Sequence, residues 1–231
     1  MTVARRRPYY LVIALYFAAI VSWGFWRNYF APLLAGHADR PWIVHLHAAV
    51  FVGWVLLLIA QTALAASGLV QLHRRVGRVG IAYGACVFVM GVAVSIGGPA
   101  LRVRAAEFPI EVGGMVALYS LADLLLFGAF LTLAFIYRAR SAVHKQWMIA
   151  ATAALGGAAV GRVLDTNSIP YLLVWLSPIF AVIAIDLLNR RRVSIVPILS
   201  GSLIVVAFFK VPLLAASVWQ DLGRALLTPF V

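Results

Sequence analysis

The chain has 231 residues, of which 64% are hydrophobic and 11% are charged, and its net charge is +12. So few polar residues cannot coat a soluble globule of this length, which excludes the usual soluble enzymes. The basic residues are spread over several connections instead of one face, so the positive charge does not indicate a nucleic-acid partner. The composition predicts an integral membrane protein whose main partner is the lipid bilayer.

Apolar stretches long enough to cross a bilayer follow one another along the chain. A membrane-spanning helix needs about 20 mostly apolar residues. Candidate stretches lie at 8–26, 42–66, 76–97, 113–137, 144–163, 169–188 and 195–219. They are continuous, whereas barrel strands would alternate apolar and polar residues over about ten positions. We therefore expect an all-α bundle of seven transmembrane helices that forms one domain over residues 1–231.

Positive charge is concentrated before the first helix and in every second connection. These residues are Arg5, Arg6, Arg7, Arg74, Arg75, Arg78, Arg138, Arg140, Lys145, Arg190, Arg191 and Arg192. Basic residues next to transmembrane helices favour the cytoplasmic side. The pattern predicts a multi-pass protein of the bacterial inner membrane with a cytoplasmic N-terminus and an outside C-terminus.

Two histidines lie at the cytoplasmic side, at matching depth. His73 precedes the third expected helix and His144 begins the fifth. A b-type haem held between helices needs two axial ligands at one level with apolar walls around the ring. We expect His73 and His144 to supply these ligands if their helices meet, and His47 in the second helix is a further cofactor-binding candidate. The alternative is that His73 and His144 are interfacial imidazoles at helix ends.

Small residues predict which helices approach closely. Gly80 and Gly84 in the third expected helix, and Gly157 and Gly161 in the fifth, have the four-residue spacing that allows close helix contact. We expect these two helices to form the packed centre of the bundle.

A second set of polar residues lies towards the outside. Asp123 and Lys210 are each about 15 Å below the outer boundary at the helical rise per residue. Ionisable groups at this depth are costly, which favours either a buried ion pair that sets helix register or an ion relay. With Arg162 and His47 they predict an outer polar cavity. His45 and His47 project about 200° apart on a helix, so no metal site is predicted.

Several segments resemble a group of uncharacterised bacterial polytopic membrane proteins with a histidine-rich second helix and an inner His-Arg loop. The segments are 45–54, Gln61, 72–77 and 144–148, and they span roughly the second to the fifth helix. The resemblance implies a membrane fold and functional roles for His47, His73 and His144, and it implies no reaction. A looser likeness to b-type membrane cytochromes rests on the transmembrane histidines, although a matching ligand pair on the outer side is missing.

These observations favour a protein that binds haem b or a similar redox cofactor and passes electrons, with a quinone or another membrane subunit as partner. Two alternatives remain open. One is a small ion- or proton-coupled transporter with an outer-facing polar cavity, and the other is a structural or regulatory membrane subunit without a cofactor. A cofactor spectrum would distinguish the redox protein, and transport that depends on Asp123 would distinguish the transporter.

Overall fold

The computed structural model describes residues 8–37, 39–190, 192–209 and 217–231, and these residues form helices and connections without a strand. The chain therefore has the expected all-α fold. The elements in order are α1 (Tyr9–Phe25), the π-helix η1 (Trp26–Phe30), α2 (Ala31–Leu34), α3 (Trp42–Ala66), α4 (Val70–Arg104), α5 (Ile110–Ile136), α6 (Ser141–Val160), α7 (Ile169–Arg190), α8 (Ile195–Phe208), α10 (Ser217–Leu227) and the 3-10 helix η2 (Thr228–Phe230).

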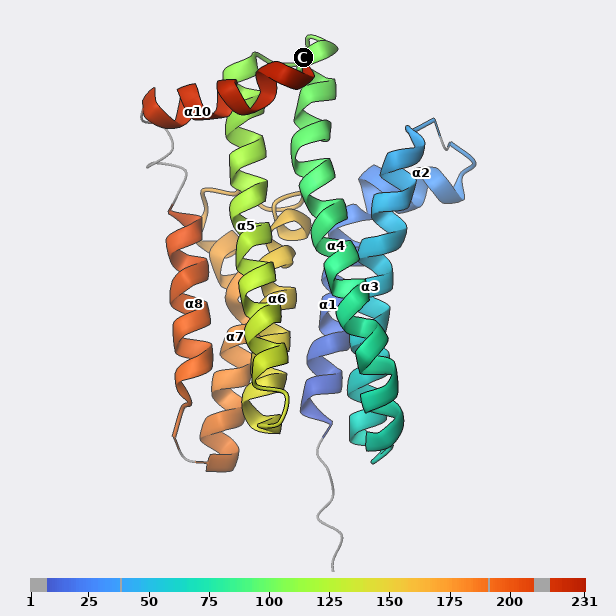
Figure 1. Cartoon of the computed structure of the whole chain (residues 1–231), viewed down its shortest axis with the longest axis vertical. Helices are drawn as coiled ribbons and strands as arrows, with labels where there is room; N and C mark the ends of the chain where they lie inside the picture. Colours follow the sequence, from blue (N-terminus) through green and yellow to red (C-terminus); the bar gives the residue numbers. More distant parts are fainter. Residues whose placement is uncertain (1–7, 38, 191, 210–216) are drawn as a thin grey trace, which may run out of the picture.

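Five helical segments are long and apolar enough to cross a membrane. They are Tyr9–Leu34, Trp42–Ala66, Val70–Arg104, Ile110–Ile136 and Ile169–Asn189. The helix α8 is apolar but shorter. The long helices run side by side as one bundle (Figure 1). The chain is therefore a multi-pass helical membrane protein.

The helix α6 is the most enclosed element of the bundle. It packs against α1, α5, α7 and α8, and residues 149–154 are all buried. The indole nitrogen of Trp175 donates to the Ala153 carbonyl oxygen at 2.8 Å, and that of Trp54 donates to the Thr152 hydroxyl at 3.2 Å. Neighbouring helices shield α6 from lipid, so it does not need the continuous apolar surface of the other spans.

The glycine pairs bring together helices other than the ones that we expected. A side chain at Gly84 would collide with Leu131 of α5, and a side chain at Gly80 would touch α3. A side chain at Gly157 would meet Tyr171 and Trp175 of α7. The small residues therefore allow α4 to pack closely against α3 and α5, and α6 to pack closely against α7. The expectation that they join α4 to α6 is wrong, and a pocket separates these two helices at one end.

Two expected helix boundaries also need correction. The helix α4 begins at Val70 and ends at Arg104, so it is longer than the helix expected at 76–97. It includes the basic residues of the expected inner turn and part of the expected outer connection. The helix expected at 195–219 ends at Phe208, and residues from Ser217 onward belong to α10. A polar stretch with Gln220, Asp221 and Arg224 follows, which fits a separate amphipathic helix better than a continued span.

Candidate functional site

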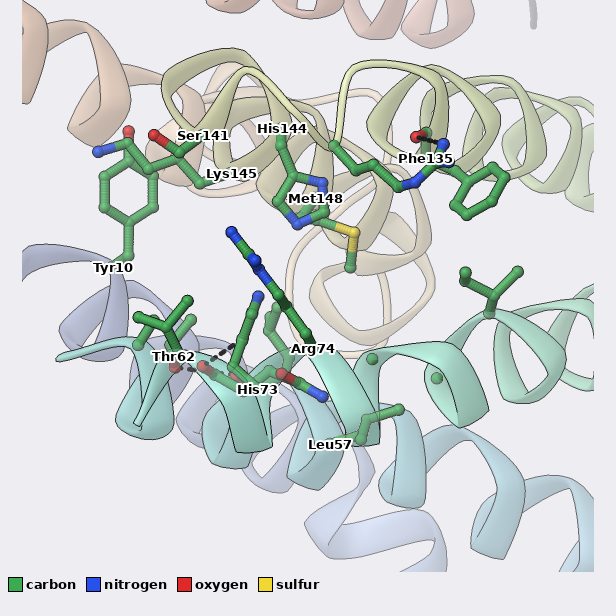
Figure 2. Close-up of a pocket in the computed structure, with 18 of the residues that line it drawn as sticks. Tyr10, Leu57, Thr62, His73, Arg74, Phe135, Ser141, His144, Lys145 and Met148 are labelled. Atoms are coloured by element: carbon green, nitrogen blue, oxygen red, sulfur yellow. Dashed lines mark hydrogen bonds between the residues drawn. The ribbon is translucent and has the colours of Figure 1, made fainter. Parts of the chain in front are cut away.

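A pocket of about 1000 Å³ opens at the end of the bundle that carries the α3–α4 and α5–α6 connections. Its walls come from α3 and α4 on one side and from α1, α5 and α6 on the other (Figure 2). The apolar part of the lining is formed by Leu11, Trp54, Leu57, Leu58, Ile81, Leu131, Phe135, Met148 and Ile149. A ligand with a large apolar body can therefore be buried here, away from water.

His73 and His144 face each other across this pocket. His73 projects from the first turn of α4 and His144 from the first turn of α6, and both rings point into the same space (Figure 2). Their ring centroids are 6.4 Å apart and the ring planes meet at 80°. The two histidines are thus brought together as expected, although by a shared pocket and not by direct packing of their helices.

Each of these imidazoles is held by a backbone carbonyl at Nδ1. Nδ1 of His144 lies 2.8 Å from the Ala134 carbonyl oxygen, and Nδ1 of His73 lies 3.2 Å from the Gln61 carbonyl oxygen. A carbonyl oxygen can only accept, so Nδ1 of His144 carries a proton towards Ala134. Nε2 of His144 then keeps its lone pair, which is the tautomer needed for metal coordination through that atom.

Gln61 fixes His73 through its side chain as well. In the orientation that satisfies its neighbours, its amide nitrogen donates to Nδ1 and to the backbone carbonyl of His73, and its amide oxygen accepts from the Gly77 N–H. Nδ1 of His73 is an acceptor in this arrangement, so the proton of the neutral ring lies on Nε2. These contacts tie the end of α3 to the first two turns of α4, and the ring of His73 is oriented by both. Gln61 therefore acts as a positioning residue for the pair.

The spacing of the two rings fits a metal ion placed between them. Metal–imidazole bonds are about 2 Å long, so a metal with one histidine on each side keeps the ring centroids roughly 6 Å apart. The observed 6.4 Å is close to this spacing. Two imidazoles and an apolar enclosure are the ligand set and surroundings that haem iron takes in membrane bundles.

The open side of the pocket is basic. Its polar lining includes Arg74, Arg75, Arg78, Arg138 and Lys145. The Arg138 guanidinium stacks on Phe135 at 4.4 Å from the ring centroid, and Lys145 Nζ lies 4.5 Å from the Tyr10 ring centroid. We call these five residues the basic rim. It suits a ligand that has an apolar body and anionic groups at one edge, as haem has with its propionates.

His47 lies elsewhere in the molecule. It is 14 residues from Gln61 on the same helix, which is about 21 Å along α3. Its ring contacts Phe51 at 4.3 Å between centroids, and within the described part of the chain its buried Nδ1 has no hydrogen-bond partner. The charge of Arg162 acts on this imidazole. His47 is therefore part of a different polar region from the His73–His144 pair.

Arg162 lies in the connection between α6 and α7. Its guanidinium stacks on Phe25 at 4.2 Å from the ring centroid and donates to the Ala158 carbonyl oxygen at 2.5 Å. These contacts hold the cation at the end of α6 away from the pocket, close enough for its charge to act on His47.

Asp123 is half-buried in α5, close enough to Tyr119 and Tyr171 for its charge to act on both. Lys210 lies outside the described residues, so the pairing of Asp123 with Lys210 stays a prediction.

A buried polar network at the pocket end of α7 was missed in the sequence. Gln146 Nε2 donates to both carboxylate oxygens of Asp186, at 3.0 and 2.9 Å. The Ser194 hydroxyl and backbone N–H donate to Asp186 Oδ2, at 2.6 and 2.9 Å. Asp186 is 3% exposed and joins α6 to the start of α8. In the sequence it precedes Arg190, Arg191 and Arg192, so it resembles an exposed residue near a helix end.

No family model, curated protein or solved structure matches this chain. The structure supports the coarser part of the resemblance, that the chain is a polytopic helical membrane protein. The link to a group with a histidine-rich second helix and an inner His-Arg loop stays a prediction.

Proposed function

We propose that the chain binds a b-type haem between His73 and His144 and passes electrons within the membrane. One observation carries the proposal: two imidazoles on opposite walls of a pocket have centroids 6.4 Å apart, and each has Nδ1 beside a backbone carbonyl oxygen. Such a pair could hold one iron through its other ring nitrogens.

Each part of the pocket has a role in this proposal. Nε2 of His73 and of His144 would hold the iron, while Gln61 and the Ala134 carbonyl keep the rings in place. The apolar walls exclude water, and the basic rim offers charge-assisted hydrogen bonds to the two propionates. Bound there, haem supplies reversible one-electron oxidation and reduction.

The proposal includes the membrane orientation and the partner. With the basic rim at the cytoplasmic surface, a bilayer crossed seven times places the N-terminus inside and the C-terminus outside. The bacterial inner membrane then provides the electron partner, a quinone or a second membrane subunit. The alternation of basic connections along the sequence supports this orientation.

The direct test is a haem titration of variants purified after growth without haem precursor. We expect the parent protein to take up one haem and to give the spectrum of a six-coordinate, low-spin iron. His73→Ala and His144→Ala should each lose that spectrum. His45→Ala is the matched control, because its Nδ1 binds the Tyr29 hydroxyl outside the pocket lining. A parent that takes up no haem, or a His144→Ala protein with the parent spectrum, would contradict the proposal.

A second candidate function is ion- or proton-coupled transport, supported by the polar groups away from the pocket. The charge of Arg162 acts on His47, and the charge of Asp123 acts on Tyr119 and Tyr171. Ionisable groups therefore lie close together in the half of the bundle away from the pocket. Its test is uptake by proteoliposomes under a proton gradient. Transport by the parent that is lost in Asp123→Asn would favour this function, and absence of uptake under every ion gradient would reject it.

A further inference from the structure

The helix α10 lies across the ends of α4 and α5 that are far from the pocket (Figure 1). It has 11 residues, so its length is about 16 Å and it is too short to cross a bilayer. Two contacts hold it on α5. Arg224 Nη2 lies 2.8 Å from Glu111 Oε1, and the backbone at Gly223 packs directly on the backbone at Gly114.

One face of α10 is apolar and exposed. Val218 is 71% exposed and Leu222 is 48% exposed, and these residues are one turn apart on the same face. Ala225 is also exposed there. Arg224 follows Leu222 by two positions and so projects about 200° away from it. Trp219, 38% exposed, lies beside the apolar face, and tryptophan is enriched where membranes meet water.

The position of α10 along the bundle matches a membrane surface. From Arg78 in the basic rim to Arg102 on α4 is 24 residues, or about 36 Å of helix. A bilayer with its headgroup regions is about 40–45 Å thick. Arg102 and Glu111 are therefore near the headgroups of the opposite leaflet, and the Arg224–Glu111 ion pair places α10 at that level.

The exposed face of α10 continues the apolar surface of the spans below it. Leu101 near the end of α4 is 50% exposed, and Val112 and Val116 near the start of α5 are 43% and 42% exposed. These side chains face lipid in a membrane-spanning helix. An apolar helix face at the same end of the bundle has the same favourable surroundings in the acyl boundary of the leaflet.

We propose that α10 is an interfacial helix that lies flat in the leaflet opposite the pocket. Val218, Leu222 and Ala225 face the acyl chains, Asp221 lies at the polar edge of this face, and Arg224 faces the headgroups and water. In this position α10 anchors the ends of α4 and α5 in the membrane surface. The inference rests on the membrane placement of the spans and does not depend on the bound cofactor.

The test is spin-label accessibility of the full chain in vesicles of phosphatidylcholine and phosphatidylglycerol. Single cysteines are introduced at Val218, Leu222 and Ser217 of a Cys86→Ala protein and labelled. Ser217 is the polar reference, because it is exposed and projects about 140° away from Leu222. A cysteine at Leu125, which is 64% exposed on α5, gives the reference for deep lipid. Collision rates are measured with oxygen, which concentrates in lipid, and with a water-soluble nickel chelate. Ala225→Cys replaces Leu222→Cys if the latter does not fold.

We expect labels at 218 and 222 to have an oxygen-to-nickel ratio several-fold above that at 217 and below that at 125. Equal, nickel-dominated ratios at 217, 218 and 222 would place α10 in water and overturn the proposal. Low collision rates with both reagents at 218 and 222 would overturn it too, because that face would then be covered by protein.

Discussion

At the residue scale, the candidate site depends on how firmly two imidazoles are oriented. The Ala134 carbonyl accepts from Nδ1 of His144, and Nδ1 of His73 contacts both the backbone carbonyl and the side-chain amide of Gln61. These contacts orient both rings before a ligand arrives. Preorganisation of this kind lowers the entropy that binding would otherwise cost.

Gln61→Leu tests the orientation of His73 without removing the ring. The substitution deletes the amide that lies on His73 Nδ1 and on the Gly77 backbone, while the Gln61 carbonyl remains. We expect haem to remain six-coordinate, with affinity lower by about 10–100-fold as for other groups that orient a metal ligand. Affinity is measured by titration and the midpoint potential by redox titration. Gln71→Leu is the control, because Gln71 is exposed on α4 and is not part of the pocket lining. An equal loss of haem affinity in both variants would contradict the role of Gln61.

Asp186 should stabilise the fold and not take part in the cofactor site. Asp186→Ala leaves the Gln146 amide and the Ser194 N–H without their buried acceptor, which should cost roughly 2–4 kcal/mol of unfolding free energy. Thermal unfolding in detergent measures the loss, and Asp186→Asn should lose less. The exposed Asp221→Ala is the control, with a change within about 0.5 kcal/mol. Parent-like unfolding of Asp186→Ala would show that the network adds no stability.

Sequence reasoning identified His73 and His144 because each lies at an expected inner connection and is followed by a basic residue. It missed Asp186 and Gln146, because burial of these polar groups depends on how α6, α7 and α8 pack together, which local composition does not encode. It also gave no indication that Ala134 would orient His144, since a backbone acceptor has no sequence signature.

At the element scale, the positions of the spans follow from hydropathy, and their ends do not. The helix α4 extends through His73 and its neighbouring arginines because nothing breaks it there, and lengthening a helix satisfies more backbone groups. The glycine pattern marked real close contacts but not their partners. Four-residue spacing creates a groove on a helix, and only the tertiary structure decides which helix occupies it.

Gly114→Val should loosen α10 from the bundle. A Cβ at this position would meet the backbone of Gly223 far closer than van der Waals contact, and backbone atoms cannot rotate away. We expect trypsin to cleave after Arg224 about tenfold faster or more, because cleavage tracks the population of the detached state. Release of residues 225–231 is followed by mass spectrometry. Gly97→Val is the control, since its Cβ would have open space; identical cleavage in all three proteins would contradict the packing of α10.

At the scale of the whole molecule, α5 is long and apolar enough to cross a membrane, so we expect its two ends on opposite sides. Arg140 lies in the turn after α5, and Arg104 lies at the far end of α4. In a Cys86→Ala background, Arg104→Cys should react with a membrane-impermeant maleimide added to intact cells stripped of their outer membrane. Arg140→Cys should react only after permeabilisation. The reverse pattern would contradict the N-inside orientation and the positive-inside argument on which it rests.

The pocket between α4 and α6 is the feature of the whole molecule that gives the chain a candidate function. Small residues allow α4 to pack closely on α3 and α5, and α6 to pack closely on α7. The pocket lies between these two groups of helices, and His73 and His144 face each other across its apolar space beside the basic rim.

The central claim is that this space holds haem between His73 and His144. Its most direct test is the absorption spectrum of the purified parent protein, from cells supplied with haem precursor, before and after dithionite. The account predicts a Soret band that shifts and sharpens on reduction. A spectrum with only aromatic absorbance from a folded, monodisperse protein would contradict it.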